Sequence, residues 1–328
     1  MNILITGGMG FIGSHLVKHM VKKYPNYRII NFDKITYASN PFFLKDIFNY
    51  NNYHEVIGDI CDEKDLNEVF KTYKITHVIH LAAESHVDNS INNPSDFIQT
   101  NIVGTSNLLK VAKFNWVNSE YKNNRFYHIS TDEVYGSLGD EGYFTETSPY
   151  DPRSPYSASK AASDHLVRAY YYTYGLPIVI SNCSNNYGPN QHHEKLIPTV
   201  IKRIKEIASI PVYGNGLNVR DWLYVGDHVS AIDTIFHHGV NGETYNIGGN
   251  NEWNNIDLVN KICDLIDERT EKPIGVSRRL ITYVTDRLGH DKRYAIDSTK
   301  LQTQLGWEPK MDFVDGLKET INWYLRQF

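Results

Sequence analysis

Apolar and polar positions in the first half of the chain alternate between short apolar runs and longer segments with helical spacing. Residues 2–6 form an apolar run that predicts a short buried strand, and residues 14–23 place apolar side chains on one helix face. Further strands are expected at residues 27–32, 53–59, 77–83, 126–130 and 177–181, and further helices near residues 63–74, 94–114 and from residue 156 onward. Repeated strand–helix units predict a parallel sheet with helices on both faces.

A glycine-rich turn links the first strand to the first helix. Gly8, Gly10 and Gly13 have the spacing of the dinucleotide fingerprint, in which glycines let the backbone turn tightly and approach a pyrophosphate at a helix N-terminus. The next strand ends at Asp33, a position from which a carboxylate binds the two ribose hydroxyls and repels a 2′-phosphate. The strand, turn, helix and acid together predict a site for NAD rather than NADP.

The second half of the chain departs from this regular pattern. From about residue 182 the elements become shorter and alternate with turn-rich segments such as 185–189 and 211–216. We therefore expect an α/β protein with a Rossmann-type doubly wound parallel sheet and a smaller, interleaved C-terminal substrate lobe. Residues 1–181 are expected to form the NAD-binding Rossmann domain, and residues 182–328 mainly the substrate-binding lobe. Because no linker-like stretch separates the two, some later segments are expected to return to the Rossmann domain.

The overall composition excludes several classes of protein. A length of 328 residues suits one large or two interlocked domains, and a net charge of -5 leaves no basic footprint for nucleic acid. No apolar run is long enough to span a membrane, and the first strand begins at residue 2, so neither a membrane span nor a signal peptide is expected. Cys61, Cys183 and Cys263 lack disulfide or metal spacing, so buried thiols in a reducing cytoplasm are expected.

Tyr156 and Lys160 carry the first sign of catalysis. They lie four residues apart in a predicted helix, so they share a face, and the ammonium of Lys160 can lie near the phenol of Tyr156. A nearby cation favours the phenolate and lowers a tyrosine pKa from about 10 toward working pH. The pair therefore predicts a base for a sugar or alcohol hydroxyl, although the same spacing also occurs on ordinary surface helices.

Asp132 and Glu133 follow directly on the predicted strand at residues 126–130. Neighbouring side chains on a continuous strand point to opposite faces, but where a strand turns into a helix both can face one substrate. Paired carboxyls in different surroundings tend to separate their pKa values, which provides one acid and one base. An isolated pair of this kind is more often a helix cap beside a solvated side chain; Tyr156 and Lys160 downstream favour catalysis here.

Several runs of the sequence resemble the extended short-chain dehydrogenase/reductase superfamily and, more narrowly, the dTDP-glucose 4,6-dehydratase family. The matching runs cover nearly the whole chain and lie at residues 6–13, 81–88, 130–136, 156–160, 184–189, 194–198, 218–222 and 286–291. The runs at 6–13 and 156–160 occur throughout the superfamily. Asp132-Glu133 and the later runs are much more specific.

The resemblance implies a lyase that converts dTDP-glucose to dTDP-4-keto-6-deoxyglucose by internal hydride transfer through bound NAD, in deoxysugar biosynthesis such as that of dTDP-rhamnose. Tyr156 would take the C4 hydroxyl proton, with Thr131 hydrogen-bonded nearby, while hydride passes to NAD. Glu133 would then remove the C5 proton, and protonated Asp132 would donate to the departing C6 hydroxyl. The stored hydride would return to C6. The resemblance thus implies Thr131, Asp132, Glu133, Tyr156 and Lys160 as the catalytic set.

Residue by residue, the resemblance also implies the lining of the cofactor and substrate sites. The cofactor site is expected to comprise Gly7, Gly10, Phe11, Ile12, Gly13, Asp33, Lys34, Ile35, Thr36, Asp59, Ile60, Leu81, Ala82, Ala83, Ser85, Thr100, Tyr156, Lys160 and Asn186. The substrate site is expected to comprise Ser85, Thr131, Asn185, Lys195, Leu196, Pro211, Val212, Tyr213, Arg220, Asn255, Arg287 and His290. Arg220 and Arg287 suit diphosphate oxygens because a guanidinium donates paired hydrogen bonds, and Tyr213 offers an aromatic surface to a pyrimidine.

A few positions depart from the usual pattern of the family. Asn89 and Asn182 stand where arginines are usual, His192-His193 replaces an aromatic–proline pair, and Leu288 replaces a frequent proline. They flank the substrate lobe rather than the catalytic set, so they bear on the preference for nucleotide and sugar. The adjacent histidines lack a third ligand at suitable spacing, and no metal is expected.

Other functions remain open at this point. A nucleotide-sugar 4-epimerase or decarboxylase of the same superfamily is the nearest alternative, although an epimerase would carry a neutral residue in place of Asp132 and Glu133. UDP-glucose is an alternative substrate, because uracil lacks only a methyl group whose burial is worth about 1 kcal/mol. A non-catalytic NAD-sensing protein would tend to lack Tyr156 or Lys160.

A homodimer is the expected assembly. Residues 94–114 and the helix after Tyr156 carry more apolar surface than one face of a sheet needs. Family members commonly pair these helices, so the resemblance implies a two-fold dimer. The apolar positions on the second helix are Ala162, Leu166, Val167, Tyr170, Tyr171 and Tyr174.

Overall fold

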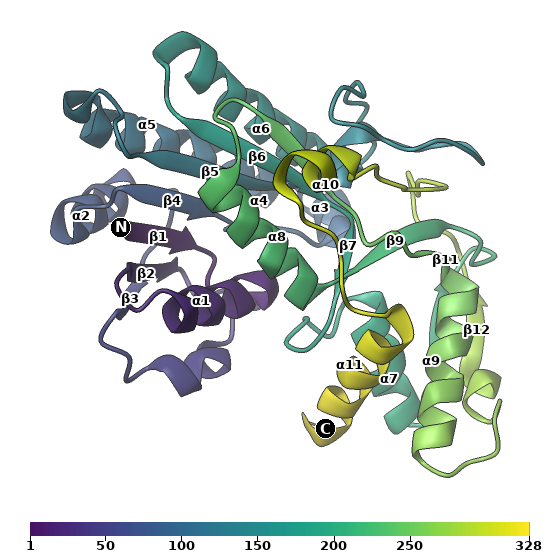
Figure 1. The fold of residues 1–328 in the computed structure, drawn as a ribbon. Coiled ribbons are helices and arrows are strands. Elements are labelled where there is room, and N and C mark those ends of the chain that lie inside the picture. The colour runs from purple at the N-terminus through teal and green to yellow at the C-terminus, as the bar shows by residue number, and fades with distance from the viewer. Residues whose placement is uncertain (328) are drawn as a thin grey trace.

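Short apolar strands build the central sheet, because strands that are apolar on both faces can be buried between two layers of helices. The computed structural model describes residues 1–327, within which seven strands pair in parallel in the order β10-β6-β5-β4-β1-β2-β3 (Figure 1). In chain order they are β1 (Asn2–Thr6), β2 (Arg28–Asp33), β3 (Tyr53–Ile57), β4 (His77–His80), β5 (Arg125–Thr131), β6 (Ile178–Cys183) and β10 (Thr244–Ile247).

Helices cover both faces of this sheet (Figure 1). Alternate residues of β1 supply the two cores: Ile3 and Ile5 pack on one side, and Leu4 packs on the other. The helices of the first side are α1 (Phe11–Lys23), α8 (Val225–His238) and α10 (Thr299–Leu305), and those of the second are α2 (Glu63–Tyr73), α5 (Thr105–Trp116) and α6 (Pro155–Tyr174). The doubly wound parallel α/β fold expected from the sequence is confirmed.

The strand order reverses at β1, and this reversal determines where a ligand can bind. Leu4 of β1 lies opposite Ile30 of β2 on one side and opposite Val78 of β4 on the other. The chain winds outward from β1 in both directions, so the connections beyond the carboxyl ends of β1 and β4 diverge. A crevice at such a switch point is the usual ligand site of an open α/β sheet.

The C-terminal lobe has a core of its own. β9 (Val219–Tyr224) pairs with β7 (Asn185–Tyr187) and β11 (Glu252–Asn254), and β8 (Ile210–Tyr213) pairs with β12 (Ile281–Val284). Around them pack α7 (Leu196–Lys205), α9 (Asn255–Arg269) and α11 (Phe313–Gln327), at the lower right of Figure 1.

The later part of the chain alternates between this lobe and the sheet. α8, β10 and α10 all follow β9 in sequence, yet they pack against the central sheet. The division at residues 181 and 182 stays a prediction; β6 itself runs to Cys183, two residues beyond the expected end of that strand.

The helical stretch expected at residues 94–114 is divided into three parts. α4 (Pro94–Phe97) leads into a π-helical turn (Ile98–Gly104), which leads into α5. The short helix α3 (Val87–Asn92) precedes them. Thr100 and Asn101 in the wide turn are both buried, and Asn101 donates to the hydroxyl of Ser159 in α6 at 2.8 Å.

Candidate active site

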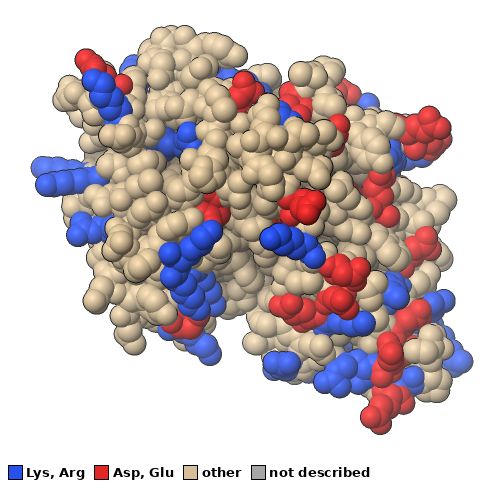
Figure 2. Space-filling view, viewed as in Figure 1, with Lys and Arg blue, Asp and Glu red and all other residues tan. Residues whose placement is uncertain are grey.

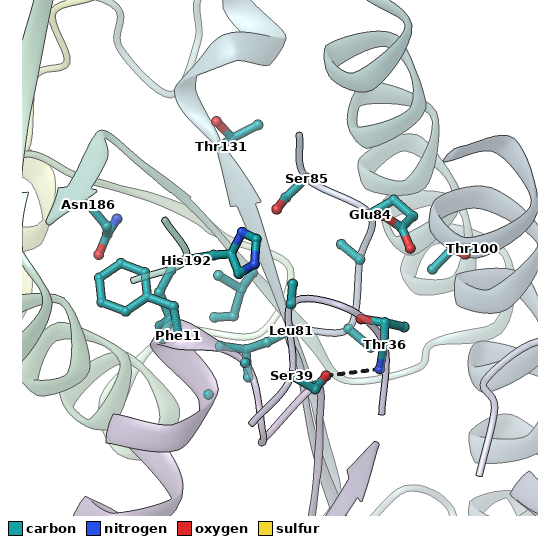
Figure 3. A pocket seen from close by; sticks show the side chains of 18 of the residues that line it. Phe11, Thr36, Ser39, Leu81, Glu84, Ser85, Thr100, Thr131, Asn186 and His192 are labelled. Atoms are coloured by element: carbon teal, nitrogen blue, oxygen red, sulfur yellow. Dashed lines mark hydrogen bonds between the residues drawn. The ribbon is translucent and has the colours of Figure 1, made fainter. Parts of the chain in front are cut away.

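A pocket lies beyond the carboxyl ends of the central strands, and most of the predicted site residues line it (Figure 3). The lining combines the glycine turn, the ends of β2, β4 and β5, the start of α6 and the segment 183–195. The predicted residues on it are Gly7, Gly10, Phe11, Ile12, Gly13, Asp33, Lys34, Thr36, Asp59, Ile60, Leu81, Ala82, Ala83, Ser85, Thr100, Thr131, Asp132, Glu133, Tyr156, Lys160, Asn185, Asn186 and Lys195.

The backbone packs too closely around the glycine turn to admit a side chain at Gly7 or Gly13. Gly7 has a φ of 72°, and a Cβ there would lie 2.8 Å from the Cα of Ala82. A Cβ at Gly13 would lie 2.1 Å from the carbonyl oxygen of Gly7. α1 starts at Phe11 without an acidic residue in its first turn, so its free N–H groups and its dipole favour an anion. These residues therefore fit the pyrophosphate of NAD.

Asp33 is anchored at the end of β2 by its neighbours. One carboxylate oxygen accepts the backbone N–H of Met9 at 2.9 Å, and the other accepts the N–H of Ile35 and the hydroxyl of Ser39, each at 2.9 Å. A carboxylate held this firmly suits two ribose hydroxyls and disfavours a phosphate in their place. Ile35 itself has an exposed side chain and is absent from the pocket lining within residues 1–327, so its part in cofactor binding stays a prediction.

The carboxyl pair lies where β5 turns into a 3-10 helix (Asp132–Tyr135). Thr131 caps this turn: its hydroxyl accepts the N–H of Glu133 at 3.3 Å and donates to Asp132 at 3.3 Å. The turn brings both carboxyls to the pocket, as the sequence predicts. Asp132 is buried, and one of its carboxylate oxygens has no hydrogen-bond partner among the described residues.

Asp132 and Glu133 differ in their electrostatic surroundings. Burial raises the pKa of Asp132 well above its usual range, and the charges of Glu133 and Asp221 raise it further. Burial also raises the pKa of Glu133, but Arg220, Lys195 and Arg287 oppose that rise. Asp132 is therefore the carboxyl that is held protonated, and Glu133 is the one whose charge is supported by cations.

Tyr156 and Lys160 both lie in the first turns of α6. Ser154 and Ser157 form a capping box at its start, and Pro155 occupies the first helical position. Burial raises the pKa of Tyr156 well above its ordinary value, and the charge of Glu133 adds to this rise. The sequence predicts a lowered pKa for Tyr156, and this direction is wrong because desolvation is the largest effect on the phenol. Lys160 instead donates to the backbone oxygen of Ile129 at 2.8 Å.

Several predicted substrate residues form a second cluster beside the pocket. Arg287 lies 2.6 Å from Asp88 and stacks over Tyr213, with 5.2 Å to the ring centre, while His290 makes a 2.7 Å contact with Asp286. These residues belong to the C-terminal lobe, except Asp88, which lies in α3. Arg287 and Lys195 both act on the pKa of Glu133, so the cluster adjoins the carboxyl pair.

Other predicted substrate residues lie deeper in the lobe. Val212 is buried in its core, and Leu196 packs against that core. Arg220 is buried and donates to the backbone oxygen of Asp291 at 3.0 Å. Pro211 lies in β8 and Asn255 begins α9. None of these five is among the residues between 1 and 327 that line the pocket, so their contact with substrate stays a prediction.

The pocket also contains residues that sequence reasoning did not select. Some were missed although they adjoin predicted ones, and Ser39 was missed because only its contact with Asp33 reveals it. Gln191 and His192 come from the loop after β7, and Figure 3 shows His192 on the same side of the pocket as Phe11. The missed residues that directly adjoin a predicted one in sequence are Phe32, Gly58, Glu84, Ser130, Ser184 and Glu194.

The positions that depart from the family pattern have ordinary partners. The amide of Asn89 donates to the hydroxyl of Tyr37 at 3.3 Å, and the ring of Tyr37 meets His192 edge-on with centroids 5.5 Å apart. Asn182 donates to the backbone oxygen of Thr131 at 2.9 Å, and Leu288 is exposed. In the part of the chain that is described, no acid–histidine–cysteine cluster has metal-ligand geometry, and no helix is long and apolar enough to cross a membrane.

Comparison with known proteins agrees with this geometry. The sequence model of the family described as GDP-mannose 4,6 dehydratase matches residues 4–320. A dTDP-glucose 4,6-dehydratase from Salmonella typhimurium is 53% identical, with 99% of this chain and 93% of that protein covered.

Two solved structures are similar over nearly their whole length. The dTDP-glucose 4,6-dehydratase of Bacillus anthracis in complex with NAD has a TM-score of 0.88 at 46% identity, covering 99% of this chain and 97% of that one. The dTDP-glucose 4,6-dehydratase of Streptomyces venezuelae with NAD and TYD bound has a TM-score of 0.91 at 40% identity, with the same coverage. The resemblance inferred from the sequence motifs is therefore confirmed. This chain belongs to the GDP-mannose 4,6 dehydratase family, in its dTDP-glucose 4,6-dehydratase branch.

Proposed function

We propose that this protein converts dTDP-glucose to dTDP-4-keto-6-deoxyglucose and water. The observation that carries the proposal is the pair Asp132 and Glu133, in which a buried carboxyl and a half-buried one lie in different electrostatic surroundings beside Tyr156. A dehydration needs an acid for the departing hydroxyl and a base for the neighbouring carbon, and a simple 4-epimerisation needs neither.

Each residue has a distinct part in the proposed reaction. When bound, NAD supplies the hydride acceptor for C4, the donor for C6 and a positive nicotinamide that favours the phenolate of Tyr156. Tyr156 takes the proton of the C4 hydroxyl, and Thr131 hydrogen-bonds that hydroxyl. Glu133 takes the C5 proton, which the new ketone has made acidic. Asp132 gives its proton to the C6 hydroxyl, which leaves as water.

Water elimination between C5 and C6 also requires a site that excludes bulk solvent. Asp132, Tyr156 and Lys160 are all buried, so a proton on Asp132 is delivered to the substrate rather than to solvent. The cations that oppose the pKa rise of Glu133 are Arg220, Lys195 and Arg287. We propose that the same cations attract the diphosphate, so that substrate binding and the charge state of Glu133 are linked.

The test is to incubate the purified protein with dTDP-glucose without added NAD. The expected product has lost one water and carries a 4-keto group, and no net NADH accumulates because the hydride is returned. A parallel reaction with UDP-glucose shows how much the thymine methyl group contributes to substrate preference. Inversion at C4 without loss of water would instead establish an epimerase, and stoichiometric NADH would establish an ordinary dehydrogenase.

We further propose that two copies pair through α5 and α6. Phe114 is 74% exposed at the end of α5, and Tyr172 is 79% exposed near the end of α6. Two neighbouring helices that both expose large apolar side chains suit a second copy of the same chain, related by a two-fold axis. Val167, which the sequence placed on this surface, is instead buried in the core of the sheet.

We propose that the protein is located in the cytoplasm. Burial raises the pKa of the thiols Cys183 and Cys263 to about 12 in each case. Cys61 is half-buried, and all three cysteines are free. Free thiols of this kind suit a reducing compartment.

A further inference from the structure

Asp164 is a fully buried carboxylate that the proposed reaction does not use. It lies in α6, one helical turn after Lys160 and two turns after Tyr156, so the three residues share the helix face toward the sheet. Its carboxylate accepts the hydroxyl of Ser130 at 2.9 Å and the hydroxyl of Tyr150 at 2.8 Å.

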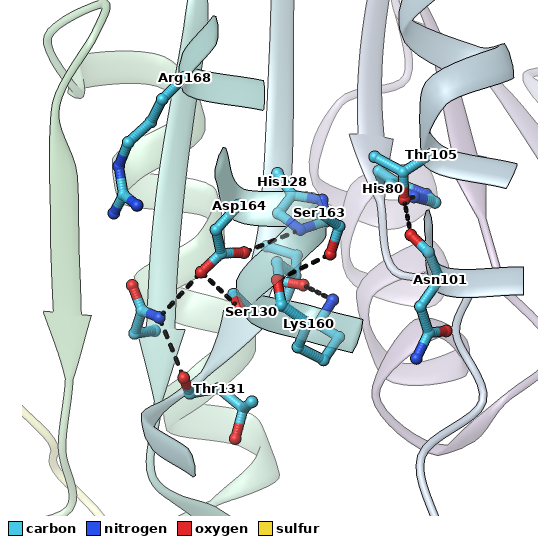
Figure 4. A network of polar contacts seen from close by, with 12 residues as sticks. His80, Asn101, Thr105, His128, Ser130, Thr131, Lys160, Ser163, Asp164 and Arg168 are labelled. Carbon is cyan, nitrogen blue, oxygen red and sulfur yellow. Dashed lines mark hydrogen bonds and ion pairs between the residues drawn. The ribbon is translucent and has the colours of Figure 1, made fainter. Parts of the chain in front are cut away.

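The contacts of Asp164 and Lys160 together cover three consecutive residues of β5 (Figure 4). His128 Nε2 lies 3.1 Å from Asp164, and the carbonyl oxygen of Ile129 accepts the ammonium of Lys160 at 2.8 Å. The hydroxyl of Ser130 then donates to Asp164.

Asn182, a position that departs from the family pattern, completes this set of contacts. Its amide nitrogen donates to the carbonyl oxygen of Thr131 at 2.9 Å and approaches Asp164 at 3.4 Å. The next residues along the chain are Asp132 and Glu133. The network therefore ties the face of α6 that carries Tyr156 and Lys160 to the strand end that carries the carboxyl pair.

We propose that Asp164 is a positioning residue, which keeps the buried ammonium of Lys160 charged and fixes α6 against the catalytic end of β5. Burying an ammonium disfavours its charged form unless a negative charge lies near. Asp164 is such a charge, one helix turn away. The proposal rests on the proposed function only for its kinetic readout.

The titratable and charged groups around the network favour this charge state. Burial lowers the pKa of Lys160, while Asp164 and Cys183 act against that fall. Burial lowers the pKa of His128 to about 4, so this imidazole is neutral near pH 7. Burial also lowers the pKa of His80 strongly, with the charges of His128 and Lys160 adding to the effect. Lys160 is therefore the cation that faces Asp164 from inside the network.

The groups around Asp164 also keep its own carboxylate charged. Burial acts to raise the pKa of Asp164, but the contact with His128, the charge of Lys160 and the hydroxyl of Ser130 outweigh it and leave that pKa below its usual value. Arg168 donates to the hydroxyl of Tyr150 at 2.9 Å, which in turn donates to Asp164. Asp164 is therefore ionised at every pH at which the reaction would run.

The test compares Asp164→Asn with Tyr150→Phe. Asp164→Asn keeps the shape and removes the charge; its amide nitrogen can donate to His128 once that imidazole carries its proton on Nδ1. Tyr150→Phe removes one hydrogen bond to the same carboxylate and keeps the charge. With dTDP-glucose, Asp164→Asn is expected to move the alkaline limb of kcat/KM to lower pH by roughly one to two units, because Lys160 loses its proton earlier. Tyr150→Phe is expected to leave the limb in place.

A second readout does not depend on activity. With lysines carrying 13C at Cε, and the Lys160 signal assigned from Lys160→Met, the NMR shift of Lys160 is followed against pH. The Lys160 titration is expected at lower pH in Asp164→Asn than in the wild-type protein. An unmoved titration would overturn the proposal whatever the variant does to rate. In the wild-type protein alone, a Lys160 signal already at the neutral-amine position at pH 7 would overturn it as well.

The two readouts separate the two proposals. If the wild-type protein does not dehydrate dTDP-glucose, the proposed function fails, while the NMR titration still decides the role of Asp164. If the enzyme is active and neither the kinetic limb nor the NMR titration moves in Asp164→Asn, the role of Asp164 fails alone.

Discussion

Arg287 holds Asp88 in a two-pronged ion pair that joins the C-terminal lobe to α3. Its Nε lies 2.6 Å from one carboxylate oxygen, and its Nη2 donates to the other at 2.9 Å. A diphosphate offers a guanidinium the same paired geometry with more negative charge. We therefore expect substrate to compete with Asp88 for Arg287.

Replacing Arg287 is expected to weaken substrate binding more than chemistry. Arg287→Lys keeps a positive charge but cannot make the paired hydrogen bonds, so KM for dTDP-glucose should rise by about tenfold or more, with a smaller fall in kcat. Steady-state kinetics measures both constants. Asp88→Asn, which releases the guanidinium without removing it, should not raise KM in this way. An unchanged KM in Arg287→Lys would place the diphosphate elsewhere.

Glu133→Gln is expected to separate oxidation from dehydration. The amide cannot take the C5 proton, yet Tyr156 and Lys160 remain able to oxidise C4. The reduced cofactor should therefore build up on the enzyme, visible by its ultraviolet absorbance, while dehydration falls by roughly 10²- to 10⁴-fold. Solvent deuterium should also fail to enter at C5. Rapid dehydration by this variant would show that the carboxyl of Glu133 is not the base that removes the C5 proton.

Asp132→Asn is expected to stop the reaction one step later. The amide preserves the shape of the side chain but cannot supply a proton to the C6 hydroxyl. Exchange of the C5 proton with solvent should continue, because Glu133 is intact, while loss of water becomes slow. Mass spectrometry in deuterated water distinguishes the two variants, and identical labelling patterns would contradict the separate roles.

The pH dependence of C4 oxidation is expected to report the charge of Tyr156. Burial and the neighbouring charge of Glu133 both raise the pKa of Tyr156, so the phenolate forms only as pH rises. The rate of hydride transfer should therefore increase with pH. Glu133→Gln removes a negative neighbour, lowers that pKa and should shift the rising limb to lower pH. Stopped-flow absorbance across a pH series checks the direction, with Tyr156→Phe as the variant that lacks the step.

The dimer proposal predicts a change in mass rather than in chemistry. Tyr172→Glu places a charge on the exposed face of α6, where burial against a second copy would be costly. Light scattering at micromolar concentration should give a dimer for the wild-type protein and a smaller mass for the variant. Leu288→Glu, at an exposed position in the C-terminal lobe, is the matched control and should stay dimeric. A wild-type monomer would rule out the assembly.

Asp233 is expected to contribute stability that is lost in strong acid. It accepts His19 and Lys23 of α1, at 2.8 Å and 2.6 Å, and so joins α1 to α8. Burial raises its pKa, but the contacts with His19, His237, Lys23 and Tyr24 outweigh this and hold the pKa far below its usual value. A depressed carboxyl pKa contributes stability above about pH 4, and this contribution is lost as pH falls toward the folded-state pKa.

Asp233→Asn should therefore lower the free energy of unfolding at pH 7 by roughly 2–4 kcal/mol. The difference from the wild-type protein should shrink as the pH is lowered below about 4. Denaturant unfolding at several pH values measures this. A difference that is constant from pH 7 to pH 3 would show that the charge of Asp233 is not responsible.

The sequence predicted the parts of the site that depend on local spacing. Gly7 and Asp33 lie at the carboxyl ends of β1 and β2, and Gly13 lies in the first turn of α1, which follows β1. The pattern of strands and helices alone therefore places them in one crevice. The pair Asp132 and Glu133 follows β5 for the same reason. The end of a strand is determined by a few consecutive residues, so positions defined by strand ends can be predicted from the sequence.

The remaining features depend on contacts between distant segments. Lys160 shares a helix face with Tyr156, yet its ammonium donates a hydrogen bond to the backbone oxygen of Ile129 in β5. Helical spacing alone does not reveal this contact. Arg287 was expected to face a diphosphate, and only the folded chain brings Asp88 to it. Desolvation likewise determines the pKa of Tyr156, and burial depth is a property of the whole packing.

The π-helical turn between α4 and α5 determines how α5 is rotated about its axis relative to α4. A π turn contains one more residue per turn than an α-helix, and removing one residue would rotate α5 by about 100° relative to α4. Thr100 would then leave the pocket lining, or Phe114 would leave the outer surface. The length of the segment Ile98–Gly104 is therefore a shared constraint: an insertion or deletion tolerated by one of these two surfaces would misalign the other.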